Sequence, residues 1–280
     1  MRRATRFRGR SLLNLWAVAG AFVLVGCAIS HTDEIQMGQE YAAELNRQLV
    51  FVRDPELNRY LTRLGDSIAR PADTRGFTWH FYLVDTKEVN AFALPAGYVY
   101  VTRGLIERTE TLSQLAGAMG HEIAHVTRRH AAQQMERMQQ ANVGVTLACV
   151  LTGVCEHEAA RVGVEVGGAA VFANYSREDE SQADDDAVAN VVRVGISPRG
   201  IPELLGKLLA ERKERPDALS AWFATHPTEE ARITRANQRI ATLDVAMLAT
   251  LTVDTPAFRQ FRSRLLSLAT HASAVREHRH

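Results

Sequence analysis

One short segment has a pattern typical of a metal site: His121-Glu122-Ile123-Ala124-His125, with histidines four residues apart. On a helix, residues four apart lie about 40° apart around the axis, so both imidazoles face one side and can reach one Zn²⁺. Glu122 lies about 100° round from His121, where it can take a proton from water instead of ligating. A pair of surface histidines is the alternative, but the apolar residues around the motif indicate a buried helix, where histidines need a partner.

A third protein ligand is expected, because a catalytic zinc usually has three and keeps one position open. His130 is not predicted to be that ligand, since on an unbroken helix it lies roughly 140° from the ligand face. A later acidic helix offers Glu180, with Asp184 one turn further on the same face. Glu180 can ligate while Asp184 accepts the outer N–H of a ligating histidine and fixes its tautomer. The alternative is a solvated acidic helix face.

Helices and short strands are predicted to position these residues. A helix should begin at Asp54-Pro55, with Asp54 as its cap. The turn signal Pro95-Ala96-Gly97 predicts a hairpin between two strands. Hydrophobic periodicity predicts strands over 78–84 and 90–101, and helices over 33–49, 111–138, 176–194, 198–212, 227–243 and 256–268. The segment 142–174, rich in small residues, is interpreted as a flap.

The amino terminus is typical of an export signal. A stretch rich in arginine precedes an apolar run from about Leu12 to Val25, which is short for a membrane span. The run ends in Leu24-Val25-Gly26-Cys27, which resembles the bacterial lipobox and implies cleavage before Cys27 with lipid on its thiol. An uncleaved anchor helix is the alternative. Several acyl chains would make the anchor stable. Ala28, where Asp would favour the inner membrane, favours the outer membrane.

Net charge and cysteine content indicate which partners and which covalent links to expect. The formal net charge of +1 gives no indication of nucleic-acid binding. In an exported domain Cys149 and Cys155 are predicted to form a disulfide, two buried thiols being the alternative.

The expected organisation is a signal peptide (1–26), a lipidated tether (27–32), a peptidase domain (33–270) and a polar tail (271–280).

Several motifs together resemble one family. They are the strand motif of residues 90–98, the HExxH at 121–125, Glu180 followed by Ala183-Asp184, and His226-Pro227 followed by Arg232. From about residue 35 to 270 the chain resembles the HtpX-like and CAAX-prenyl-protease-like zinc metallopeptidases, peptidase family M forty-eight, and most of all their periplasmic lipoprotein members. It departs from them at Ala96, where the family usually has glycine.

The resemblance implies an α+β, mostly helical, zincin-like (gluzincin) domain with a small antiparallel sheet beside the active-site helix. It implies one Zn²⁺ per chain, held by His121, His125 and Glu180, with Glu122 as the base. Asn90 and Ala91 would belong to an edge strand that binds the substrate backbone.

The resemblance also places His226 and Arg232 near the zinc. Arg232 would stabilise an oxyanion, and His226 would do likewise or occupy the open position; a simple helix start is the alternative for His226-Pro227. The implied substrates are unfolded or misassembled envelope proteins, met on the periplasmic side of the membrane through the lipid anchor. The rival interpretations are a non-catalytic chaperone and a latent protease closed by the 142–174 flap or by His226.

Overall fold

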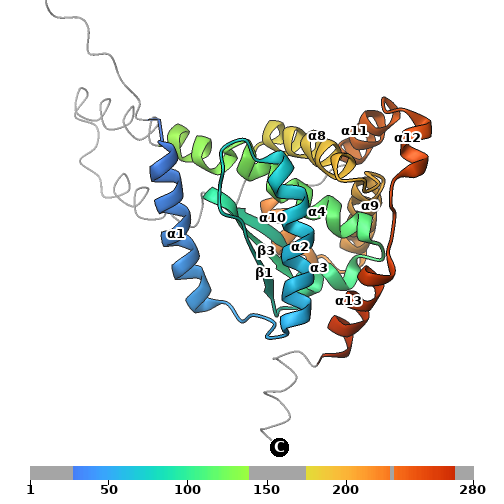
Figure 1. Cartoon of the computed structure of the whole chain (residues 1–280), viewed down its shortest axis with the longest axis horizontal. Coiled ribbons are helices and arrows are strands. Elements are labelled where there is room, and N and C mark those ends of the chain that lie inside the picture. Colours follow the sequence, from blue (N-terminus) through green and yellow to red (C-terminus); the bar gives the residue numbers. More distant parts are fainter. Residues whose placement is uncertain (1–27, 139–174, 228–229, 269–280) are drawn as a thin grey trace, which may run out of the picture.

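The computed structural model describes residues 28–138, 175–227 and 230–268 (Figure 1). The predicted signal peptide, Cys27, Cys149, Cys155, the 142–174 flap and the polar tail lie outside these residues. In chain order the elements are α1 (His31–Gln48), α2 (Pro55–Ala72), β1 (His80–Val84), β2 (Ala91–Leu94), the 3₁₀ turn η1 (Pro95–Gly97), β3 (Tyr98–Thr102), α3 (Arg103–Arg108), α4 (Leu112–Thr127), α8 (Arg177–Arg193), α9 (Gly200–Glu214), η3 (Asp217–Leu219), α10 (Ser220–Thr225), α11 (Glu230–Ala241), α12 (Val245–Thr250) and α13 (Pro256–Ser267). Residues 130–138 are also helical.

Helix α4 lies at the centre of the fold (Figure 1). All its residues from Leu112 to Val126 are buried, because α8, α2, α9 and β2 all pack against it. Small residues let α8 approach closely: a Cβ added at Gly120 would lie 3.3 Å from Cγ1 of Val191. The helix that carries the HExxH motif is therefore buried, as its apolar composition predicts, and α8 runs directly beside it.

The sheet is mixed, which corrects the expected antiparallel sheet. Its strand order is β1-β3-β2, with β2 antiparallel and β1 parallel to β3. The predicted hairpin is present, because η1 joins β2 to β3 directly. The hairpin occupies one side of β3, and β1 pairs with the other side in the same direction. Ala96 has a φ of 62°, a left-handed conformation that favours glycine. Alanine thus replaces the family's usual glycine at a position where the backbone disfavours a side chain.

The predicted helix over 111–138 is interrupted, so that prediction is wrong in one place. Arg129 has a φ of 61°, and the turn at 128–129 separates α4 from the helical residues 130–138. Long-range contacts stabilise the turn: the Arg129 guanidinium donates to Oε2 of Glu34 at 2.8 Å and to the carbonyl of Ile29 at 2.6 Å. The periodicity of the sequence continues across this turn, but the direction of the chain does not.

The described part of the predicted tether is packed against the domain. Ile29 is buried, and its backbone N–H donates to Oε1 of Glu136 at 2.8 Å. Ser30 caps α1, which begins at His31. Glu34 is also buried and pairs with Arg129 and with Arg75, the latter at 2.7 Å. The boundary at residue 33 is therefore a few residues late.

The other helices agree with the periodicity to within a few residues. Asp54 caps α2 as predicted, accepting from the backbone N–H groups of Glu56 and Leu57. The short helices α3, α10 and α12 were not expected from the pattern. Among the described helices there is none with the length and apolar character needed to cross a membrane.

Candidate metal centre

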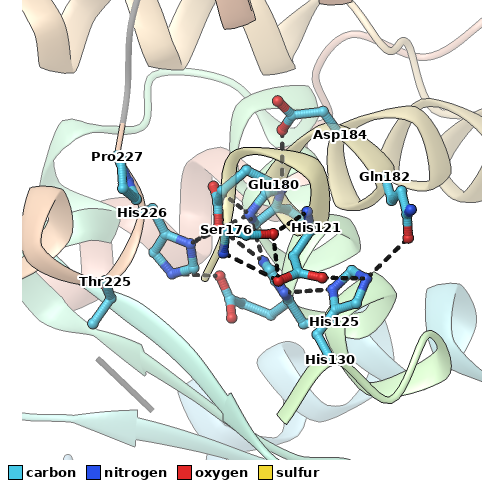
Figure 2. Close-up of polar contacts among 12 residues, drawn as sticks. His121, His125, His130, Ser176, Glu180, Gln182, Asp184, Thr225, His226 and Pro227 are labelled. Carbon is cyan, nitrogen blue, oxygen red and sulfur yellow. Dashed lines mark hydrogen bonds and ion pairs between the residues drawn. The ribbon is translucent and has the colours of Figure 1, made fainter. Parts of the chain in front are cut away.

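Four buried side chains converge between α4, α8 and the end of α10: His121, His125, Glu180 and His226 (Figure 2). One ligand atom from each lies within 4.8 Å of the others. Nε2 of His125 lies 3.0 Å from Nε2 of His121 and 3.3 Å from Oε1 of Glu180. The helical spacing thus brings both imidazoles to one point, as expected, and α8 supplies the carboxylate.

Helix α8 presents Glu180 from its first turn. Ser176 and Asp179 form a capping box that begins the helix, and this sets the position of the next residue, Glu180. Burial by itself favours the neutral acid, but His226 and His121 lower the pKa of Glu180 well below its usual range. Glu180 is therefore a carboxylate, the form that binds a metal ion.

Asp184 lies behind His121, one turn after Glu180. Its Oδ1 is 3.0 Å from Nδ1 of His121, on the side of the ring away from the cluster. Arg232 meets Asp184 in a buried bidentate pair, with Nε to Oδ2 at 2.8 Å and Nη2 to Oδ1 at 2.7 Å. Burial opposes ionisation, but Arg232 and His121 hold the pKa of Asp184 at about 2. Nη1 of Arg232 contacts Glu180, so the structure directs this guanidinium at two carboxylates.

Glu122 is completely buried, and neither carboxylate oxygen has a hydrogen-bond partner among the described residues. The imidazole of His226 lies beside it, with 3.3 Å between Nε2 and Oε1 of Glu122. Burial raises the pKa of Glu122 above its usual value. A buried carboxylate without partners is costly, which is consistent with a site that holds a metal ion and water beside it.

His226 follows the last residue of α10 and points into the cluster (Figure 2). Its Nδ1 is 3.1 Å from Oε1 of Glu180 and 3.4 Å from Nε2 of His121. Its Nε2 lies 3.3 Å from the carbonyl of Ala91 on β2. His226 therefore contacts both the metal-binding cluster and the edge strand.

The comparisons agree with this geometry. A model of Peptidase family M48 matches residues 53–240. The chain belongs to Peptidase family M48. It is 33% identical to the Beta-barrel assembly-enhancing protease of Escherichia coli O157:H7, over 76% of this chain and 45% of the relative. It is 28% identical to the Mitochondrial metalloendopeptidase OMA1 of Arabidopsis thaliana, over 61% of this chain and 34% of the relative. It is 23% identical to the Metalloprotease YcaL of Escherichia coli K12, over 81% of this chain and 88% of the relative.

The chain thus spans less than half of the assembly-enhancing protease that it matches. The predicted family and the mostly helical α+β fold are confirmed. The donor set of this M48 domain also fits zinc, because two histidines and one glutamate are ligands typical of a catalytic zinc site.

Asn90 and Ala91 lie at one edge of the sheet. Among the described strands β2 is at the edge of the sheet next to α4. Ala91 is its first residue, and Asn90 just before it extends the pairing, since its carbonyl accepts from the backbone N–H of Thr102 at 3.0 Å. The side chain of Asn90 faces Thr225, with 3.5 Å between Oδ1 and Oγ1.

Sequence reasoning missed two residues that contact His125. The ring of Tyr175 stacks on the ring of His125, with centroids 3.9 Å apart. Helix geometry predicts only that His130 is not a metal ligand, and His130 is absent from the cluster; its Nδ1 instead lies 2.9 Å from Nδ1 of His125. A histidine five residues after the motif was the available signal for His130, whereas nothing in the sequence pointed to Tyr175.

Proposed function

We propose that this chain is a zinc-dependent endopeptidase. The observation that carries the proposal is the meeting of His121, His125 and Glu180 beside the buried, unpartnered carboxylate of Glu122. A structural zinc site uses four protein ligands and needs no carboxylate that can act as a base. Metal-assisted hydrolysis uses both a metal site and a base, and this cluster has candidates for both.

His121, His125 and Glu180 would hold one Zn²⁺ through Nε2, Nε2 and the carboxylate oxygens. When bound, zinc supplies a Lewis acid that polarises a peptide carbonyl and lowers the pKa of water. Glu122 would accept a proton from the attacking water and deliver it to the leaving amine. Its raised pKa, caused by burial, brings this carboxylate closer to the neutral pH at which it must gain and lose that proton.

Asp184 and Arg232 support the ligands from behind. Asp184 would hold His121 with a proton on Nδ1, so that Nε2 is free to ligate. The contacts of Arg232 with Asp184 and Glu180 favour a positioning role. Stabilisation of an oxyanion, the role implied by the family, would require Arg232 to turn from these carboxylates to the substrate.

The substrate is proposed to be an extended polypeptide that adds to β2. An open sheet edge binds a peptide by main-chain hydrogen bonds, which suits chains of many sequences. Asn90 and Ala91 begin this edge beside the cluster. The carbonyl of Ala91 faces His226 at 3.3 Å, so His226 and a substrate strand would compete for the same acceptor.

The cellular setting is proposed from the amino terminus and the relatives together. The signal pattern and Cys27 support export and a lipid anchor on the periplasmic side of the outer membrane. The name of the Escherichia coli relative, an assembly-enhancing protease, supports substrates among unfolded or misassembled envelope proteins. In such an oxidising compartment a Cys149–Cys155 disulfide would restrain the segment between the ligand-bearing helices.

A latent form of the same protease is a second candidate, favoured by the position of His226. This side chain lies against Glu122 and Glu180 at once, and it is 1% exposed. An imidazole in that place would occupy the open ligand position and cover the base. A non-catalytic chaperone using the same cleft is favoured less, because it has no use for Glu122.

Digestion of an unfolded protein tests the proposal. Casein is incubated with the zinc-loaded wild type, with Glu122→Gln and with Glu40→Gln, an exposed glutamate on α1 that serves as the matched control. We expect cleavage by the wild type and Glu40→Gln, loss of cleavage with chelator, and loss of nearly all cleavage in Glu122→Gln with zinc content unchanged. Undiminished turnover in zinc-loaded Glu122→Gln would rule out the proposed base.

A further inference from the structure

His130 lies behind His125, on the side of the ring that faces away from the metal-binding cluster (Figure 2). His125 directs Nε2 at the cluster, with His121 at 3.0 Å and Glu180 at 3.3 Å. Its other nitrogen, Nδ1, lies 2.9 Å from Nδ1 of His130. Because this pair lies outside the metal-binding cluster, no metal ion can lie between the two nitrogens, so they share one hydrogen bond in which one donates and the other accepts.

The far side of His130 shows which nitrogen donates. Nε2 of His130 faces two oxygens, Oε1 of Gln182 at 3.3 Å and Oδ1 of Asp179 at 3.8 Å. The amide of Gln182 is itself oriented, because its NH₂ group donates to Oε1 of Glu178 at 2.9 Å and leaves the carbonyl oxygen toward His130. Since both facing atoms are acceptors, Nε2 of His130 carries a proton.

The remaining protons follow from this assignment. A neutral imidazole with its proton on Nε2 has an acceptor at Nδ1. Nδ1 of His125 must then be the donor, which leaves Nε2 of His125 with its lone pair directed at the cluster. This is the tautomer that ligates a metal ion through Nε2.

The interrupted helix makes this contact possible. On an unbroken helix His130 would lie far round from the ligand face. The left-handed Arg129, with a φ of 61°, turns the chain just before His130. His130 is then completely buried against His125 and α8.

We propose that His130 is a positioning residue for the metal centre, the neutral acceptor that sets the tautomer and ring orientation of His125. Asp184 has the corresponding place behind His121, with its Oδ1 3.0 Å from Nδ1. The two ligating histidines are thus supported differently, one by a carboxylate and the other by an imidazole that Gln182 orients. The inference rests on the proposed zinc site.

Zinc affinity of the full chain, measured by competition with a chromophoric chelator, tests the inference. His130→Leu removes the acceptor, and His130→Gln restores a carbonyl oxygen that can accept. The matched control is His80→Leu, which removes a half-buried histidine stacked on Tyr98. Loss of an outer partner of a ligating histidine typically weakens metal binding about 10–100-fold. We expect that loss in His130→Leu, partial recovery in His130→Gln, and wild-type affinity in His80→Leu.

A second readout separates positioning from packing. The melting temperature of the chelator-treated protein reports stability without zinc, and we expect any decrease in His130→Leu to be recovered in His130→Gln, which restores an acceptor for Nδ1–H of His125. Wild-type zinc affinity in His130→Leu would overturn the inference while leaving the proposed function in place. A lowered melting temperature with no recovery in His130→Gln would assign His130 to packing alone and also overturn it. A wild type that binds no zinc would instead refute the proposed function, and this inference with it.

Discussion

The buried pair between Arg232 and Asp184 should contribute far more stability than a pair of the same geometry on the surface. Arg232 makes two hydrogen bonds to Asp184, at 2.8 and 2.7 Å, and the two side chains are 6% and 5% exposed. Removing one partner of a buried ion pair leaves an uncompensated charge and costs about 3–5 kcal/mol. We therefore expect Arg232→Met to lower the free energy of unfolding of the zinc-free protein by that amount.

The chain contains a matched control. Arg128 pairs with Asp186 through the same two nitrogens, at 2.6 and 2.7 Å, but these side chains are 44% and 30% exposed. Exposed pairs contribute about 0–1 kcal/mol, because water and salt screen them. Arg128→Met should therefore destabilise the protein only slightly.

The assay is thermal unfolding after zinc removal. For domains of about 150–250 residues, 1 kcal/mol corresponds to about 2–4 °C, so Arg232→Met should lower the melting temperature by roughly 6–20 °C. Adding Asp184→Asn to Arg232→Met should cost about 0.5–3 kcal/mol less than the sum of the single changes, since the groups are in direct contact. An Arg232→Met variant no less stable than Arg128→Met would refute the reasoning. If that variant also kept its zinc but lost turnover, Arg232 would be assigned to the substrate oxyanion instead.

Three further predictions concern zinc, access and the anchor. Glu180→Ala should bind zinc more weakly, while Glu178→Ala, which removes a neighbouring carboxylate from the same helix, should bind it nearly as well; metal analysis giving the reverse order would show that the assignment on α8 is wrong. His226→Ala should raise a low basal rate of casein cleavage by exposing Glu122, whereas a fast wild type with a much slower variant would favour a role of His226 in the transition state. Cys27→Ser should abolish lipid labelling and signal processing, and labelling that persists would indicate an ordinary anchor helix.

The sequence alone was enough to single out His121, His125 and Glu180, which the structure brings together. The spacing of His121 and His125 dictates a shared helix face wherever the helix lies. The same local rule relates Glu180 to Asp184, and local capping chemistry places the start of α2 at Asp54. These features depend on neighbours within about one helical turn, so periodicity and residue type predict them.

Contacts between distant segments determine the strand direction, the turn at Arg129 and the positions of His130 and His226, which local sequence rules do not predict. The direction in which β1 pairs with β3 depends on where the chain crosses the sheet, so the parallel pairing was not predicted. The turn at Arg129 follows from a guanidinium that meets Glu34 and Ile29, about 100 residues earlier in the chain. His130 gained its place behind His125 only through that turn. In the same way His226 lies 3.3 Å from Ala91, which is 135 residues earlier in the chain. No spacing along the chain encodes this proximity, because it depends on β2 packing against α4 and on His226 meeting His121 of the same helix.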